Sequence, residues 1–172
     1  ALRFNGITYL PDRKRDVAFT GGKFNLPDVN ANIGLAQLAR LPEFLATRRA
    51  LVARYFERFA TDPPCVLPPL PRDGDGQSWN MFSVLLPLDR LTVTRKEVRD
   101  ALDAQGIGTG VSYEALHLCT LGRRYGHKEG DFPAAERIAR ETLTLPLHAG
   151  MTTADVDRVC AALAAVVAGA RR

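Results

Sequence analysis

The sequence predicts an α+β fold, in which a small antiparallel or mixed sheet packs against helices. Stretches with helical spacing alternate with short apolar stretches along the 172 residues. The connections between them are too short for a full doubly wound domain, which leaves a layered arrangement of one sheet and its helices. Hydrophobic residues make up 46% of the chain and charged residues 24%, which is ordinary for a globular domain with a real core.

Two helices are predicted on either side of Pro42. Pro27 suits the first turn of the first helix, and the apolar residues after it cover so much of its surface that we expect burial on two sides. Pro42 breaks or kinks this helix because proline lacks a backbone N–H. A second helix is predicted over 44–59 from apolar residues at helical spacing. On its other face we favour a solvated surface for four arginines: Arg48, Arg49, Arg54 and Arg58.

The middle of the chain is predicted to hold a linker, a buried strand and a capped helix. Prolines and glycines over 61–77 exclude regular structure. The stretch 78–86 is apolar on both faces, which is typical of a strand covered on both sides, and Pro87 ends it. A capping box at 94–97 then begins a helix that Gly106 ends.

The remaining third of the chain continues this alternation. Residues 107–113 are predicted to form a short strand that enters a loop. A helix is expected over 131–142, because Pro133 suits its first turn. A short strand over 143–147 and a capped helix over 152–168 complete the predicted elements.

Charge and hydropathy limit the classes of partner. The net charge is +4, but the basic residues are scattered and no basic block is interleaved with aromatic residues. We therefore expect no nucleic-acid partner and favour a small anionic ligand. No apolar run approaches the ~20 residues that span a bilayer, so no membrane partner is expected. The chain opens without a signal-peptide pattern and has three widely spaced cysteines, which favours a reducing cytoplasmic location.

The residues alone define no complete catalytic constellation, but they suggest ligand contacts. The loop over 20–28 offers an amide and backbone donors at a helix start, which is a usual place for an anion. Tyr113 can point its hydroxyl into a cleft or cap the core. His117 can contact a ligand or be an ordinary surface histidine. The other two histidines are not at ligand spacing from His117, so no metal site is expected.

Short motifs in a fixed order cover almost the whole chain. They lie at 2–7, 22–31, 33–38, 48–55, 78–82, 106–117, 125–126, 132–136, 145–147 and 151–155. Together they resemble the C-terminal segment of a DegT/StrS-type sugar aminotransferase. The resemblance implies the small domain of a pyridoxal-phosphate (PLP) enzyme of fold type I, the aspartate aminotransferase fold.

The resemblance also implies a reaction, a cofactor and site residues. Enzymes of this family move an amino group, usually from glutamate, to a keto-sugar attached to a nucleotide, and they are homodimers with active sites at the subunit interface. Asn25 resembles the amide that reaches the phosphate of the neighbouring subunit's PLP. Tyr113 and His117 match the region near the substrate, whereas Ser112 stands where histidine is common, which puts that histidine's role in doubt. The glycine-rich stretch over 106–110 looks most like enzymes that aminate a 4-keto pentose linked to UDP.

One departure from the family is an absence. The family's Schiff-base lysine lies upstream of the matching segment, and none of the chain's four lysines stands in its context: Lys14, Lys23, Lys96 and Lys128. We therefore expect no catalytic residue in this chain and no transaminase activity from it alone. Residues 1–24 are interpreted as a poorly ordered stub of the large PLP-binding domain, and residues 25–172 as the small C-terminal domain. The alternative is a stand-alone binding or interaction module that reuses the small-domain fold.

Overall fold

The computed structural model describes residues 7–9, 11, 15–17, 22, 26–72 and 76–171. The chain divides into two compact units, Ala1–Pro42 and Glu43–Arg172. The boundary expected between residues 24 and 25 lies within 23–25, which are outside the described residues, and stays a prediction. The same holds for the poor order expected of residues 1–24, most of which are not described.

The first unit contains a strand pair and a helix. Strands β1 (Ile7–Tyr9) and β2 (Arg15–Val17) pair antiparallel, with Ile7 opposite Val17, a pairing that the sequence did not predict. Helix α1 (Asp28–Ala39) buries none of its residues. Its large apolar side chains and that of the preceding Leu26 are exposed: Leu26, Val29, Ile33, Leu35 and Leu38. The expected burial on two sides is therefore wrong for this structure, because no described residue covers the helix.

The break predicted at Pro42 is confirmed. Helix α1 ends at Ala39, Arg40 forms a turn, and helix α2 (Leu41–Arg58) begins with Pro42 in its first turn. Proline is tolerated there because the first backbone N–H groups of a helix have no intrahelical acceptor.

The sheet of the second unit is small and antiparallel. Strand β3 (Phe82–Leu85) pairs with β4 (Thr142–Leu145), with Phe82 opposite Leu145. Single bridges extend the pair on each side, from Val66 to Leu85 and from Gly110 to Thr144. The α+β prediction with a small antiparallel sheet is confirmed.

The strand predicted over 107–113 is reduced to its one bridge at Gly110. Gly110 and Thr144 exchange two backbone hydrogen bonds of 2.9 and 2.8 Å. Beyond Gly110, hydrogen bonds between side chains replace those of the backbone. The hydroxyl of Thr144 donates to Ser112 Oγ at 2.9 Å. The prediction of a strand is therefore wrong, because side-chain hydrogen bonds replace the backbone ladder after one residue pair.

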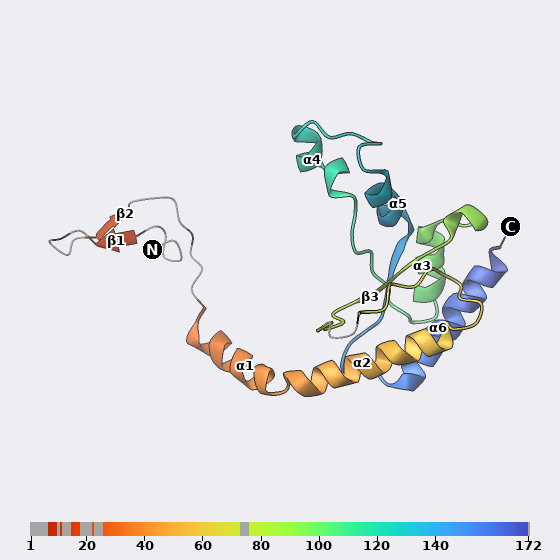
Figure 1. Cartoon of the computed structure of the whole chain (residues 1–172), viewed down its shortest axis with the longest axis horizontal. Coiled ribbons are helices and arrows are strands. Elements are labelled where there is room, and N and C mark those ends of the chain that lie inside the picture. Colours follow the sequence, from red (N-terminus) through yellow and green to blue (C-terminus); the bar gives the residue numbers. More distant parts are fainter. Residues whose placement is uncertain are drawn as a thin grey trace. The chain divides into compact units, whose positions relative to one another are not determined.

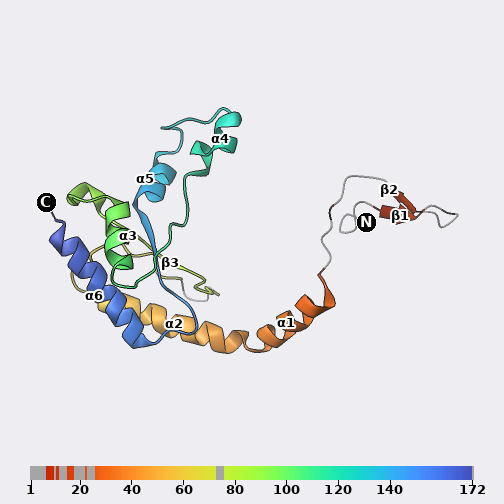
Figure 2. The ribbon, with the colours of Figure 1, turned by 180° about the vertical axis from the view of Figure 1, so that it is seen from behind.

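Helices surround this sheet. In the second unit, α6 (Thr153–Gly169) lies beside α2 and α3 (Arg95–Asp103), as Figure 1 shows and Figure 2 confirms from behind. Helices α4 (Thr120–Arg124) and α5 (Pro133–Glu141) lie on the other side of the paired strands. Two short 3-10 helices, η1 (Leu88–Arg90) and η2 (Leu116–Leu118), lie in the connections.

Local sequence signals set the helix ends. Both predicted capping boxes are present, at Thr94 with Glu97 and at Thr152 with Asp155. After α3, Ile107 N donates to Leu102 O at 3.0 Å, and Gly106 has a φ of +71°. This is the bond pattern of a glycine-ended helix, because glycine adopts the left-handed conformation without a Cβ penalty.

The core joins α2, the sheet and α6. Tyr55 and Phe82 are fully buried, and their rings stack with centroids 4.6 Å apart. The hydroxyl of Tyr55 donates to Pro146 O at 2.8 Å, which satisfies the buried polar atom. Trp79, with its centroid 6.1 Å from that of Phe82, adds a third ring to this cluster.

The arginines of α2 form only part of the solvated face favoured by the sequence. Arg54 binds Asp157 of α6 through two hydrogen bonds of 2.7 and 2.8 Å, and this contact lowers the pKa of Asp157. Arg58 lies 3.4 Å from the same carboxylate. Arg48 is half-buried, and its Nε has no hydrogen-bond partner among the described residues. The solvated face is therefore found for Arg49 and Arg58, which are exposed, and not for Arg48 and Arg54, which are half-buried. Arg54 and Arg58 fasten α2 to α6 through Asp157.

Candidate substrate-binding site

The structure brings two of the three predicted site residues together. Tyr113 and His117 line one hollow of about 460 Å³ between the loop after Gly110 and helix α5. Asn25 lies outside the described residues, so its predicted phosphate contact stays a prediction. The hollow has mostly apolar walls, and its lining residues are Tyr113, Glu114, Ala115, Leu116, His117, Ala135, Ile138 and Ala139.

Tyr113 stands at the mouth of this hollow. Its side chain is 68% exposed, so the alternative in which it caps the core is wrong. Ser112, the residue before it, is held against β4 by the hydroxyl of Thr144, and the peptide bond between Ser112 and Tyr113 is cis. The backbone that carries Tyr113 is thus anchored to the sheet, while the phenol is free to meet a ligand.

His117 is the buried member of the pair. It lies in η2 and is only 8% exposed, so the alternative of an ordinary surface histidine is wrong. Its Nε2 lies 2.8 Å from Glu136 Oε1. The edge of its ring meets the ring of Phe132, with centroids 4.9 Å apart. The imidazole is therefore held on two sides by residues at the start of α5.

Glu136 is the residue of this site to which sequence reasoning gave no role. Its Oε1 lies 2.8 Å from His117 Nε2 and accepts from the backbone N–H groups of Gly130 at 2.8 Å and Phe132 at 3.5 Å. These donors, the His117 hydrogen bond foremost, lower the pKa of the Glu136 carboxyl, so the carboxylate is ionised at neutral pH. The signal was the short motif over 132–136, a helix start with an acidic first turn, but the motif does not reveal its partner 19 residues away.

A second hollow of about 420 Å³ is lined by Glu136 and shares Glu114, Ala115 and Ala139 with the first. Its walls carry both signs of charge. Arg95 lies 3.3 Å from Glu114 and also donates to Ala139 O. Because acids and bases alternate here, this hollow does not select for anions as a cluster of unpaired arginines would.

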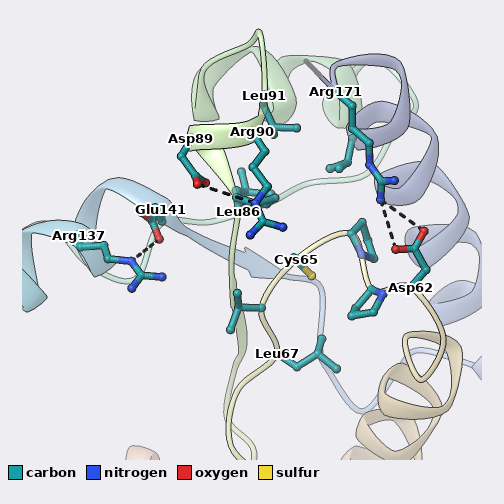
Figure 3. A pocket seen from close by; sticks show the side chains of 15 residues that line it. Asp62, Cys65, Leu67, Leu86, Asp89, Arg90, Leu91, Arg137, Glu141 and Arg171 are labelled. Atoms are coloured by element: carbon teal, nitrogen blue, oxygen red, sulfur yellow. Dashed lines mark hydrogen bonds and ion pairs between the residues drawn. The ribbon is translucent and has the colours of Figure 1, made fainter.

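A further hollow of about 1060 Å³ is lined by none of the predicted site residues. Figure 3 shows that its arginines face carboxylates: Arg171 lies 3.4 Å from Asp62, and Arg137 lies 3.0 Å from Glu141. Burial raises the pKa of the Cys65 thiol in its wall to about 12, which rules out a thiolate at neutral pH. This hollow offers neither an unpaired cation nor a nucleophile.

The described lysines do not fit a Schiff base with PLP. Lys96 is exposed on α3 and lies 2.6 Å from Asp100, and Lys128 is exposed in a loop. Neither lines any of the hollows described above. Lys14 and Lys23 lie outside the described residues. We therefore derive no step through PLP from this structure.

Within the described residues, no group of three or more His, Cys, Asp or Glu side chains could hold a metal ion. In that same part, no helix is both long and apolar enough to cross a bilayer.

Comparison with known proteins places this fold in a family. The profile of the DegT/DnrJ/EryC1/StrS aminotransferase family matches residues 1–164. The spore coat polysaccharide biosynthesis protein SpsC of Bacillus subtilis is 34% identical over 157 residues, which are 90% of this chain and 40% of SpsC. The chain thus spans about two fifths of the length of this relative.

Solved structures agree with this placement. The aminotransferase TlmJ from Streptoalloteichus hindustanus is 33% identical, with a TM-score of 0.83 over 98% of this chain and 43% of TlmJ. The PLP-form of the putative sugar aminotransferase Spr1654 from Streptococcus pneumoniae shares the fold, with a TM-score of 0.84 at 24% identity. The match covers 98% of this chain and 42% of the Spr1654 chain.

Proposed function

We propose the function of this chain from its family: it belongs to the DegT/DnrJ/EryC1/StrS aminotransferase family. We infer that residues 25–172 act as the small C-terminal domain of a sugar aminotransferase and residues 1–24 as part of its large PLP-binding domain. The match to only 40% of SpsC and 43% of TlmJ supports this assignment. The activity then belongs to a longer protein of which this chain is one part.

The proposed reaction moves an amino group from glutamate to a nucleotide-linked keto-sugar in cell-envelope or secondary-metabolite sugar biosynthesis. PLP supplies the electron sink when it is bound, and the protein supplies orientation and electrostatics. A 4-keto pentose linked to UDP is the substrate that the sequence favours. The homodimer, the contact of Asn25 with the neighbouring subunit's cofactor phosphate and a cytoplasmic location stay predictions.

In this reaction the chain contributes substrate contacts. Tyr113 offers an exposed phenol at the mouth of the hollow, and His117 offers an imidazole held in place by Glu136. The apolar walls formed by Leu116 and Ile138 suit the body of a sugar or base better than a diphosphate.

One observation carries the proposal that the chain is inactive alone. The hollow that holds Tyr113 and His117 contains no lysine, and the two described lysines are both exposed. Without a Schiff-base lysine, PLP has no covalent attachment to the protein and no group that moves the proton between carbon centres.

The test is amino transfer by the purified chain. PLP, glutamate and a UDP-linked 4-keto pentose are added, and the aminated sugar is measured by mass spectrometry. We expect no product above a reaction without protein, whereas a full-length relative that carries the lysine forms product under the same conditions. Product that grows with the concentration of this chain alone would contradict the proposal.

The alternative of a stand-alone binding module makes a different prediction. It requires residues 1–24 to pack on and cover the helices over 29–59. Most of residues 1–24 lie outside the described residues, and α1 buries none of its side chains. No described contact favours the module over the aminotransferase domain.

A further inference from the structure

The hydrogen bonds around Glu136 determine which nitrogen of His117 carries the proton. Oε1 of Glu136 accepts from two backbone N–H groups and lies 2.8 Å from His117 Nε2. The lowered pKa of the carboxyl means that this oxygen belongs to an ionised group, which can only accept. Nε2 must therefore be the donor, and in the neutral ring Nδ1 is then the acceptor.

The Nδ1 atom is open to an outside group. It has no hydrogen-bond partner among the described residues. In the same part of the chain, Arg48 Nε is the single side-chain nitrogen or oxygen that is sealed from solvent without a partner. His117 Nδ1 is therefore not sealed, although the ring as a whole is only 8% exposed.

We propose that Glu136 is a positioning residue that holds His117 in its Nε2–H tautomer, so that His117 presents a hydrogen-bond acceptor at Nδ1 to a ligand in the hollow beside Tyr113. The assignment of Nδ1 to a ligand rests on the proposed function, whereas the tautomer rests on the contacts of Glu136 alone. A carboxylate that orients a histidine through its other nitrogen is a general device for fixing the tautomer.

This arrangement specifies the chemistry of the ligand. An acceptor nitrogen binds a hydroxyl or an N–H group and does not bind an ionised phosphate oxygen, which is itself an acceptor. Sugar hydroxyls and the N–H of a uracil base have the required donor. The hollow would therefore take the sugar or base end of a nucleotide sugar, with the diphosphate outside it.

The restraint on His117 comes from several elements. Pro133 begins α5, so Glu136 lies in the first turn, where Gly130 and Phe132 donate to it. The ring of Phe132 contacts the rings of both His117 and His127. Rotation of the imidazole would therefore break a hydrogen bond and a ring contact together.

Other charged groups surround the pair and must be held constant in a test. His127 lies 3.6 Å from Asp131 in the loop that precedes α5. The adjoining hollow brings further charges close to Glu136: Arg95, Glu114, Glu129 and Arg140. A variant that changes only the charge of residue 136 is therefore compared with one that changes a matched carboxylate elsewhere on α5.

The experiment is long-range ¹H–¹⁵N spectroscopy of the chain labelled with ¹⁵N-histidine, at a pH where histidines are neutral. His127→Gln and His148→Gln assign the three rings. We expect His117 to show a protonated Nε2 with a downfield proton and an unprotonated Nδ1. A protonated Nδ1 in the unaltered chain overturns the proposal.

The variants separate positioning from folding. Glu136→Gln keeps an oxygen acceptor, so we expect the Nε2–H tautomer to remain and its proton to shift upfield as the charge is lost. Glu136→Ala removes the acceptor and should give a mixture of both tautomers. Glu141→Gln, the matched control that alters a carboxylate paired with Arg137, should leave the His117 signals unchanged.

Each result for the His117 signals can be interpreted without reference to amino transfer. An unchanged His117 proton in Glu136→Gln overturns the proposal, even if Glu136→Ala fails to fold. An unchanged tautomer in a folded Glu136→Ala overturns it too. Product in the transfer assay would overturn the proposed function of the isolated chain and leave the tautomer result as measured.

Discussion

Phe82→Ala is expected to lower the free energy of unfolding by about 3–5 kcal/mol. Phe82 is fully buried in β3, and its ring contacts three others, those of Tyr55, Phe56 and Trp79. Removing the ring loses its transfer free energy and leaves a cavity that the paired strands cannot collapse into, because backbone hydrogen bonds fix them. Urea unfolding followed by tryptophan fluorescence measures the change, since Trp79 lies beside the ring.

Phe132→Ala is the matched control for this prediction. Phe132 is 48% exposed and contacts only the two histidines among the aromatic residues described. Its replacement deletes the same atoms but much less buried area, so the loss should be less than half as large. Equal losses for the two variants, or a loss below about 1 kcal/mol for Phe82→Ala, would contradict the assignment of Phe82 to the centre of the core.

Gly122→Ala is expected to displace helix α4 from η2 and to destabilise this part of the chain by about 1–3 kcal/mol. A Cβ at Gly122 would lie 2.5 Å from His117 Cα, His117 O and Leu116 O. These are backbone atoms, which cannot turn aside as a side chain can. The helix must therefore move away from the segment that carries His117.

Hydrogen exchange measures this effect locally. The amides of Arg123 and Tyr125, which donate to carbonyls within this turn, should exchange faster in Gly122→Ala. Gly108→Ala is the control, because nothing lies within 4 Å of the Cβ position at Gly108. Unchanged protection in Gly122→Ala, or an equal change in Gly108→Ala, would show that α4 does not pack on η2 as described.

The elements predicted correctly from the sequence are those that local signals define. The capping boxes at Thr94 and Thr152 lie within four residues of their partners, so the sequence alone specifies the hydrogen bonds. Gly106 ends α3 for a similarly local reason, because the left-handed turn needs a residue without a Cβ. Pro42 separates α1 from α2 through its own missing N–H.

The features that the sequence missed depend on contacts far apart along the chain. The strand expected over 107–113 needed a partner ladder, and only Gly110 pairs with β4. The burial of His117 depends on Glu136 and Phe132, which come from a different element. Spacing along one chain does not encode such pairings, so the histidine's environment could not be predicted.

For helix α1, the sequence predicted a burial that the described residues do not provide. Its apolar residues correctly indicated a surface that prefers burial, but no described residue covers it. Five large apolar side chains on and just before α1 are exposed, a density that marks an interaction surface in soluble proteins. This exposure agrees with the proposal that the chain is one part of a longer aminotransferase.

The most direct measurement of the central claim is covalent labelling by PLP. The purified chain is mixed with PLP and reduced with borohydride, and the labelled peptides are mapped by mass spectrometry. We predict no stoichiometric label, because Lys96 and Lys128 are exposed outside the hollows described and neither Lys14 nor Lys23 stands in the sequence context of a Schiff-base lysine. A single, complete label on any one of the four lysines would mean that the chain holds its own cofactor, and would contradict its assignment as a small domain that lacks the catalytic lysine.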